Sequence, residues 1–130
     1  MKPPEAFENW LGLRATRKYK DGMLCSLRIE PWMYNGAGVI HGGILASVAD
    51  EAAWHAIRSA FPERTAMTTS ELKVDYLRPA RGARLTARGY VLKLGRTLCV
   101  SRVEIRDENR RLAAHATVTY ALLRKPAPLQ

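Results

Sequence analysis

The feature that most limits the fold of this chain is a single long amphipathic segment at residues 41–60. Its apolar residues recur every three or four positions, as they do along the buried face of an α-helix. They are Ile44, Leu45, Val48, Ala49, Ala52, Ala53, Ala56 and Ile57. Only one other helical segment is expected, a short one at about residues 4–11 that stops at Gly12. The long helix must therefore bury its apolar face against strands.

The segments on both sides of this helix alternate apolar and polar residues with the two-residue period of β-strands. Residues 13–31 predict a hairpin that turns at Asp21-Gly22. Four more alternating segments follow the helix, at 66–79, 84–95, 98–107 and 111–123. We predict one α+β domain over residues 1–130, in which an antiparallel sheet of about six strands packs one face on the helix.

Charge and hydropathy exclude several classes of protein. No apolar run approaches the roughly 20 residues of a membrane span, and residues 1–12 lack the apolar core of a signal peptide. We therefore expect a cytoplasmic protein with no membrane partner. The net charge of +9 suits a nucleic acid, a phosphate-bearing small ligand or a solvated surface. Because the basic residues are dispersed and accompany no nucleic-acid-binding motif, we expect no nucleic-acid partner.

Several reactive side chains have ordinary structural explanations. Cys25 and Cys99 lie in strand-like segments, which predicts two reduced, half-buried thiols rather than a nucleophile. The three histidines form no cluster with the cysteines, so we expect no metal site. We expect His55 at a surface or interface and Trp54 in the core; the alternative for Trp54 is the wall of a substrate tunnel.

The start and the middle of the long helix carry residues that are unfavourable there unless they serve a purpose. Gly42 and Gly43 are poor helix formers, but free N–H groups at a helix start attract negative charge, and a missing Cβ lets a carbonyl approach. A tight turn would also use this pair. Asp50 lies nine residues after His41, about 13.5 Å along a helix. Asp50 is either structural or serves the glycine site of a second copy, packed antiparallel about a two-fold axis.

This segment resembles the hotdog-fold acyl-CoA thioesterases, in particular their phenylacetate-pathway (PaaI-like) branch. The shared pattern is an Asn, a Gly, then His-Gly-Gly at a helix start and an Asp nine residues after the His. Here it reads Asn35, Gly38, His41-Gly42-Gly43 and Asp50. The stretches "TTSELKVDYLRPA" and "GYVLKLGRTLCVSRVEIRDENRRLAAHATVTY" are similar to later parts of the family, so the likeness covers about residues 12–123. It implies a hotdog fold, a curved antiparallel sheet wrapped around one central helix.

The resemblance also implies roles for individual residues. Asp50 is expected to be the nucleophile or the general base, beside a water that Thr69 of the same chain orients. The Gly42 N–H is expected to hold the thioester oxygen. His41 and Asn35 are expected to shape the pocket and to polarise the thioester or hold water.

Other residues are expected to contact the substrate. Gly43 lies at the same helix start as Gly42, and Arg78 and Arg96 are expected to contact the phosphates of coenzyme A, because guanidinium groups match phosphate well. Neighbouring residues of a helix point about 100° apart. We therefore expect only one carboxylate of the Asp50-Glu51 pair to face the site.

Thioester hydrolysis fits this set of residues on chemical grounds. A thiolate leaving group needs little protonation, so a carboxylate and an oxyanion donor suffice without a Ser-His-Asp triad. We predict an acyl-CoA thioesterase that needs no cofactor, since coenzyme A is part of the substrate, and that forms a homodimer or a tetramer of two dimers. The alternatives are a non-catalytic acyl-CoA-binding module and a hydratase or dehydratase. Hydratases of this fold pair an Asp with a His five residues later, and this chain has Gly36 five residues before His41.

Overall fold

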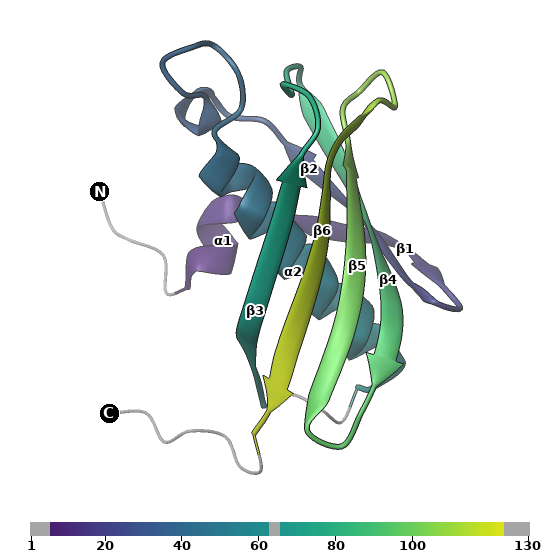
Figure 1. The fold of residues 1–130 in the computed structure, drawn as a ribbon. Coiled ribbons are helices and arrows are strands. Elements are labelled where there is room, and N and C mark those ends of the chain that lie inside the picture. Colours follow the sequence, from purple (N-terminus) through teal and green to yellow (C-terminus); the bar gives the residue numbers. More distant parts are fainter. Residues whose placement is uncertain (1–5, 63–65, 124–130) are drawn as a thin grey trace.

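A computed structural model describes residues 6–62 and 66–123, and it shows a curved sheet wrapped around one long helix (Figure 1). The elements are α1 (Phe7–Leu11), β1 (Arg14–Tyr19), β2 (Gly22–Arg28), a 3₁₀ turn (Pro31–Met33), α2 (Gly42–Ala60), β3 (Met67–Tyr76), β4 (Arg84–Leu94), β5 (Leu98–Arg106) and β6 (Leu112–Leu122). This arrangement confirms the predicted α+β class and the position of the long helix. The predicted first helix is shorter than expected, and residues 4 and 5 of that prediction lie outside the described residues.

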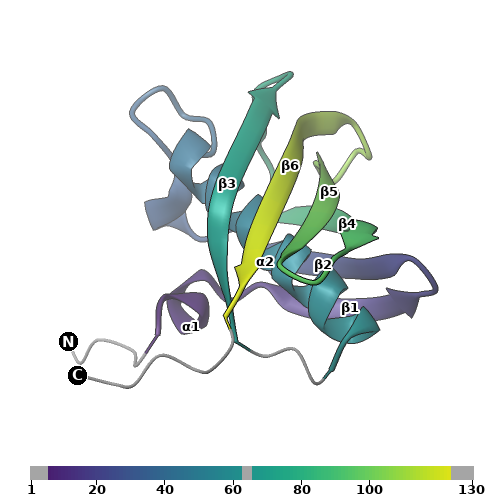
Figure 2. The ribbon, with the colours of Figure 1, turned by 60° about the horizontal axis from the view of Figure 1, so that its bottom comes forward.

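The six strands form one antiparallel sheet in the order β1-β2-β4-β5-β6-β3. The sheet bends around α2, as the tilted view shows (Figure 2). Two strands, β1 and β3, lie at its edges, so each has one side of its backbone without a neighbouring strand among the described residues. The β3 edge is ten residues long and leaves Leu72 36% and Tyr76 54% exposed. The unpaired backbone N–H and C=O groups of a long edge strand can pair with a second strand.

The face of α2 that meets the sheet is built mainly from small residues. Four alanines on this face are fully buried, together with Leu45, Val48 and Ile57. Small side chains allow the backbone of the helix to approach the sheet closely, so the strands can curve around it. Residues on the other faces of α2 are only partly buried, so their side chains can line a site.

Both cysteines are free and fully buried, so the prediction of half-buried thiols is wrong in degree. Each lies at an inward position of its strand, where alternation turns the side chain toward α2. Burial, and to a lesser extent the charge of Glu51, raises the pKa of the Cys25 thiol to about 12. A thiol this hard to ionise is a poor nucleophile.

The first hairpin turns one residue earlier than predicted. Tyr19 pairs with Gly22, so the turn is Lys20-Asp21 and Gly22 is the first residue of β2. A Cβ on Gly22 would lie 1.9 Å from the carbonyl oxygen of Gly89 on the neighbouring strand. Gly22 is therefore required by the close approach of β2 to β4. Of the predicted Asp21-Gly22 pair, only Asp21 lies in the turn. Within the described ranges, no helix is long and apolar enough to cross a membrane.

Candidate active site

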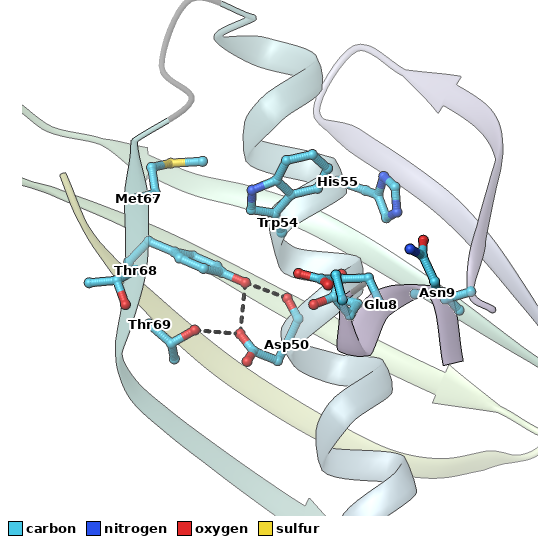
Figure 3. Close-up of a pocket in the computed structure, with 12 residues that line it drawn as sticks. Glu8, Asn9, Asp50, Trp54, His55, Met67, Thr68 and Thr69 are labelled. Carbon is cyan, nitrogen blue, oxygen red and sulfur yellow. Dashed lines mark hydrogen bonds between the residues drawn. The ribbon is translucent and has the colours of Figure 1, made fainter. Parts of the chain in front are cut away.

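The Asp50 carboxylate lies in the middle of α2 and is held by two hydroxyl groups of the same chain (Figure 3). The hydroxyl of Thr69 on β3 donates to Oδ1 of Asp50 at 2.7 Å, and the hydroxyl of Tyr120 on β6 donates to the same oxygen at 2.7 Å. Thr69 and Tyr120 are register partners on adjacent strands, which is why they reach one carboxylate together. Among the described residues, no group donates to Oδ2, so this oxygen remains available to water or a substrate.

Tyr120 is a member of the site that the sequence analysis missed. Its side chain is 4% exposed, and its hydroxyl lies within hydrogen-bond distance of the backbone carbonyl of Asp50 as well as its carboxylate. Burial, followed by the hydrogen bond to Asp50 and its charge, raises the pKa of the Tyr120 hydroxyl far above its usual value. Tyr120 therefore remains protonated and acts as a donor. Its signal in the sequence was a lone tyrosine among small and β-branched residues of the last strand.

Asp50 opens onto a cavity of about 660 Å³ between β3 and α1. The residues lining it are Ala6, Glu8, Asn9, Leu13, Asp50, Glu51, Trp54, His55, Met67, Thr68, Thr69 and Tyr120. Glu51 is among them, so the expectation that only one carboxylate of the pair faces the site is wrong. The cavity spans two neighbouring positions of the helix, and α1 contributes Glu8 and Asn9 to its wall.

Two aromatic side chains of α2 line the same cavity. Trp54 is partly buried and packs against the core, as predicted, and it also lines this cavity. Its ring meets His55 edge-on, with centroids 5.2 Å apart. Burial lowers the pKa of His55, so its imidazole is neutral near pH 7. His55 therefore adds a polar but uncharged group to the wall of the cavity.

The N-terminal end of α2 is organised by backbone and capping contacts. His41 caps the helix, and its Nδ1 accepts the N–H of Gly43 at 2.8 Å. A Cβ on Gly43 would lie only 3.0 Å from that Nδ1, which explains why a glycine suits this position. The N–H of Gly42 has no acceptor among the described residues, whereas its carbonyl accepts the Tyr76 hydroxyl at 2.7 Å. Gly42 thus presents one free donor at the positive end of the helix.

The remaining predicted site residues lie apart from Asp50. The Oδ1 atom of Asn35 accepts the N–H groups of Ala37 and Val39 at 2.9 and 3.2 Å, so this side chain shapes the loop before α2. Arg78 lines a second cavity of about 360 Å³ together with Gly42. Arg96 is exposed on the turn between β4 and β5, at the opposite end of α2 (Figure 1).

Within one chain, the predicted residues therefore form two separate groups. Thr69 lies at Asp50, whereas Gly43, His41 and Arg78 gather near Gly42. Gly42 and Asp50 line different cavities and are eight residues apart on α2, which is about 12 Å along the axis. Across residues 6–62 and 66–123, no three His, Cys, Asp or Glu side chains are placed to hold a metal ion.

Comparison with known proteins connects these features to one family. A family model described as the thioesterase superfamily matches residues 37–114, which include Gly42, Asp50 and Thr69. The chain is 34% identical to the medium/long-chain acyl-CoA thioesterase YigI of Escherichia coli, over 88% of this chain and 83% of that protein.

Known structures share the fold over nearly the whole chain. A thioesterase from Haemophilus influenzae superposes with a TM-score of 0.83 at 23% identity, covering 92% of this chain and 83% of that one. A variant of the phenylacetic acid degradation protein PaaI from Thermus thermophilus superposes with a TM-score of 0.77 at 27% identity, covering 90% and 98%. The predicted hotdog fold, family and enzyme class are confirmed by these matches. The chain belongs to the thioesterase superfamily, as a hotdog-fold thioester hydrolase of the PaaI-like kind.

Proposed function

We propose that the protein hydrolyses acyl-CoA thioesters, with Asp50 as the carboxylate that activates water or attacks the carbonyl carbon. The observation that carries this proposal is the hydrogen bonding of the Asp50 carboxylate. Its Oδ1 accepts the hydroxyls of Thr69 and Tyr120, whereas its Oδ2 has no donor in the described part of the chain. The similarity to a named acyl-CoA thioesterase supports the substrate class, and makes medium- and long-chain acyl groups the first candidates.

The reaction needs little beyond these groups. Asp50 takes a proton from water while the water oxygen bonds to the thioester carbon, and the carbonyl electron pair moves onto its oxygen. The Gly42 N–H then stabilises the oxyanion. When that electron pair returns, the carbon–sulfur bond breaks and coenzyme A leaves as a thiolate, which takes up the proton. In the alternative, Asp50 attacks first and forms an anhydride that water then hydrolyses.

A second copy of the chain would bring the two halves of the site together. Gly42 and Asp50 line different cavities, so one small thioester cannot contact both in a single chain. The exposed ten-residue edge of β3, which carries Thr69, supports pairing with the same strand of another copy. Two-fold pairing turns α2 of the second copy around, so that its Gly42 end points toward Asp50 of the first. Association of two such dimers into a tetramer is the further step of this proposal.

The basic surface supports recognition of the nucleotide end of coenzyme A. Arg78 lines the cavity that contains Gly42, which is where the phosphates would enter if the thioester oxygen lies at the Gly42 N–H. Arg96 is placed at the other end of α2, so its contact with phosphate depends on the partner copy. Affinity for coenzyme A should fall as salt is added, because exposed charges are screened within about 8–10 Å at physiological ionic strength.

A panel of acyl-CoA thioesters, assayed with a thiol-reactive dye, tests the activity directly. We expect hydrolysis of one or more neutral acyl-CoA esters, which Asp50→Asn slows by on the order of 10²-fold or more. Absence of thiol release from every ester of the panel would contradict the proposal and favour an acyl-CoA-binding module.

Single-turnover hydrolysis in ¹⁸O-water distinguishes the two roles of Asp50. A nucleophilic Asp50 acquires the label in its own carboxylate when water attacks the aspartyl carbon of the anhydride. A general base leaves the label only in the product acid. Sedimentation of the same samples gives the oligomeric state, and a fully active monomer would exclude the shared site.

A further inference from the structure

Glu51 is a carboxyl group in the cavity for which the proposed reaction has no use. It follows Asp50 directly on α2 and lines the same cavity of about 660 Å³. Unlike Asp50, it has no hydrogen bond and no ion pair with any described residue. It therefore adds a second carboxylate, adjacent to Asp50 in the chain, to the wall of the space that the acyl group would occupy.

The described residues that line the cavity supply no cation to compensate the charge of Glu51. No lysine or arginine is among the described residues that line the cavity, although the chain has 21 of them. The titratable groups near Glu51 are Glu8 of α1, Asp50 and His55 of α2, Cys25 of β2 and Tyr120 of β6. None of these is a cation near pH 7, because burial keeps His55 neutral. The cavity is thus negative inside a protein whose net charge is +9.

The rest of the wall suits an uncharged acyl group. Leu13, Trp54 and Met67 supply apolar surface, and Thr68 and Asn9 supply neutral polar groups. An apolar chain can lie on this surface without disturbing Glu51. A chain that ends in a second carboxylate would bring a negative charge beside Glu51 and Glu8, with no lysine or arginine among the described lining residues to offset it.

We infer that Glu51 is a specificity-determining residue, which restricts the acyl group to neutral chains and rejects acyl-CoA esters with a distal carboxylate. The inference rests on the proposed function, because it assumes that the acyl group occupies the cavity at Asp50. It also separates two uses of charge in the protein. The basic outer surface attracts the phosphates of coenzyme A, while the acidic cavity selects against a charged acyl end.

The selection should depend on pH in a defined direction. Burial, followed by the charges of Glu8 and Asp50, raises the pKa of Glu51 to about 7. A distal carboxylate is ionised throughout the range from pH 6 to pH 8. Glu51 is largely neutral at pH 6 and ionised at pH 8, so repulsion of a charged acyl end should grow as the pH rises.

Matched pairs of substrates test the inference. The pairs are butanoyl- and succinyl-CoA, hexanoyl- and adipoyl-CoA, and octanoyl- and suberoyl-CoA, each with equal chain length and differing by the terminal carboxylate. For the parent at pH 8 we expect kcat/KM to favour the neutral member by on the order of tenfold or more, as two like charges in a cavity would produce. Glu51→Gln should lower this preference severalfold, mainly through faster hydrolysis of the charged member, and should remove its dependence on pH.

A matched control removes the same charge on the other face of the sheet. Glu104 projects from β5 away from α2 and pairs with Arg102 and Arg106, so Glu104→Gln should keep the parent's preference at every pH. Equal hydrolysis of both members by the parent, or a preference that Glu51→Gln leaves unchanged for all three pairs, overturns the inference. Hydrolysis of the charged members alone would also overturn it, whereas failure of the parent to hydrolyse any ester of the panel would instead overturn the proposed function.

Discussion

The middle of α2 and its N-terminal end are organised in different ways. In the middle, Asp50 is oriented by side chains of its own chain, one from β3 and one from β6. At the N-terminal end, Gly42 has a free N–H at an exposed cavity, and the side chains around it serve the cap and the preceding loop. One region is complete within a single chain, whereas the other offers a donor to something outside it.

This difference indicates that the carboxylate and the oxyanion donor of the proposed site are positioned in different ways. A carboxylate must be aimed to within a few tenths of an ångström, and the rigid strands behind α2 can hold its partners in place. A backbone N–H is aimed by the helix itself, so it can be delivered by a second copy without side-chain support. Substitutions in the two regions should therefore have separable effects.

The largest effect is expected for Asp50→Asn. The amide can still accept the Thr69 and Tyr120 hydroxyls at its oxygen, so the fold is preserved while the base is lost. We expect kcat to fall by on the order of 10²–10⁴-fold with KM nearly unchanged, because the lost interaction belongs to the transition state. Steady-state assays with the best acyl-CoA of the panel measure both constants. Activity within twofold of the parent would make Asp50 a structural residue.

Gly42→Pro tests the N-terminal end of α2, and its expected effect on kcat is the next largest after that of Asp50→Asn. Gly42 is the first residue of α2, where proline is well accepted, and His41 has φ −59° and ψ 136°, which suit a residue before proline. The change removes the N–H and keeps the helix, so kcat should fall by on the order of 10²–10³-fold. Gly42→Ala is the control, because it adds a Cβ about 3.4 Å from the Tyr76 ring but retains the donor.

Mixing the two defective chains tests whether the regions cooperate across a dimer. A heterodimer of one Asp50→Asn chain and one Gly42→Pro chain contains one intact site and one site with both defects. Random pairing should restore about a quarter of the parent activity, because half of the dimers are mixed and each has one working site of two. Recovery is expected only after co-refolding or co-expression. A mixture as inactive as its components would place both groups in the same chain's site.

The sequence predicted the fold well where the signals are local. The spacing of Leu45, Val48 and Ala52 identifies α2, and alternation identifies the strands, because each pattern lies within one element. The hairpin turn was misplaced by one residue because the contact that requires Gly22 comes from β4, far along the chain. Local patterns do not contain information about such cross-strand contacts.

The candidate site was predicted less completely, for the same reason. The motif around Asp50 marks the carboxylate and the helix start, but Tyr120 reaches Asp50 from 70 residues away and only the register of β6 with β3 brings it there. The place of Glu51 in the cavity was misjudged because helix periodicity alone does not reveal that Glu8 and Asn9 of α1 help to form the same cavity. The roles of Gly43, His41, Asn35, Arg78 and Arg96 remain predictions for experiment.

A smaller effect is expected for Tyr120→Phe, which tests how far the middle of α2 is self-contained. The change removes one of two donors to Asp50 and leaves Thr69 in place. A hydrogen bond to a charged group contributes about 1.5–3 kcal/mol, and partial retention of orientation by Thr69 should limit the loss in kcat to about tenfold. Thr69→Val should act similarly, and the double variant should lose more than either. If Tyr120→Phe is neutral and Thr69→Val is not, Thr69 alone orients the carboxylate.

The smallest effect concerns stability and the contrast between Asp50 and its neighbour Glu51. Glu51 has no partner in the described structure, and its pKa is raised to about 7 from an ordinary value of 4.5. The folded state therefore disfavours the carboxylate, and this penalty is absent at low pH, grows between pH 4.5 and 7 and is constant above 7. Since Glu51 is only half-buried, solvent screening should limit the penalty to about 1 kcal/mol. Glu51→Gln should thus raise Tm at pH 8 by roughly 3–5 °C, and by much less at pH 5.

Glu104→Gln is the control with the opposite expected sign. Burial alone would raise the pKa of Glu104, but hydrogen bonds and charges, chiefly from Arg102, lower it. That variant should lower Tm by similar amounts at both pH values. A Glu51→Gln protein that is less stable than the parent at pH 8 would show that Glu51 has a stabilising partner, and would remove the basis for treating its carboxylate as free in the cavity.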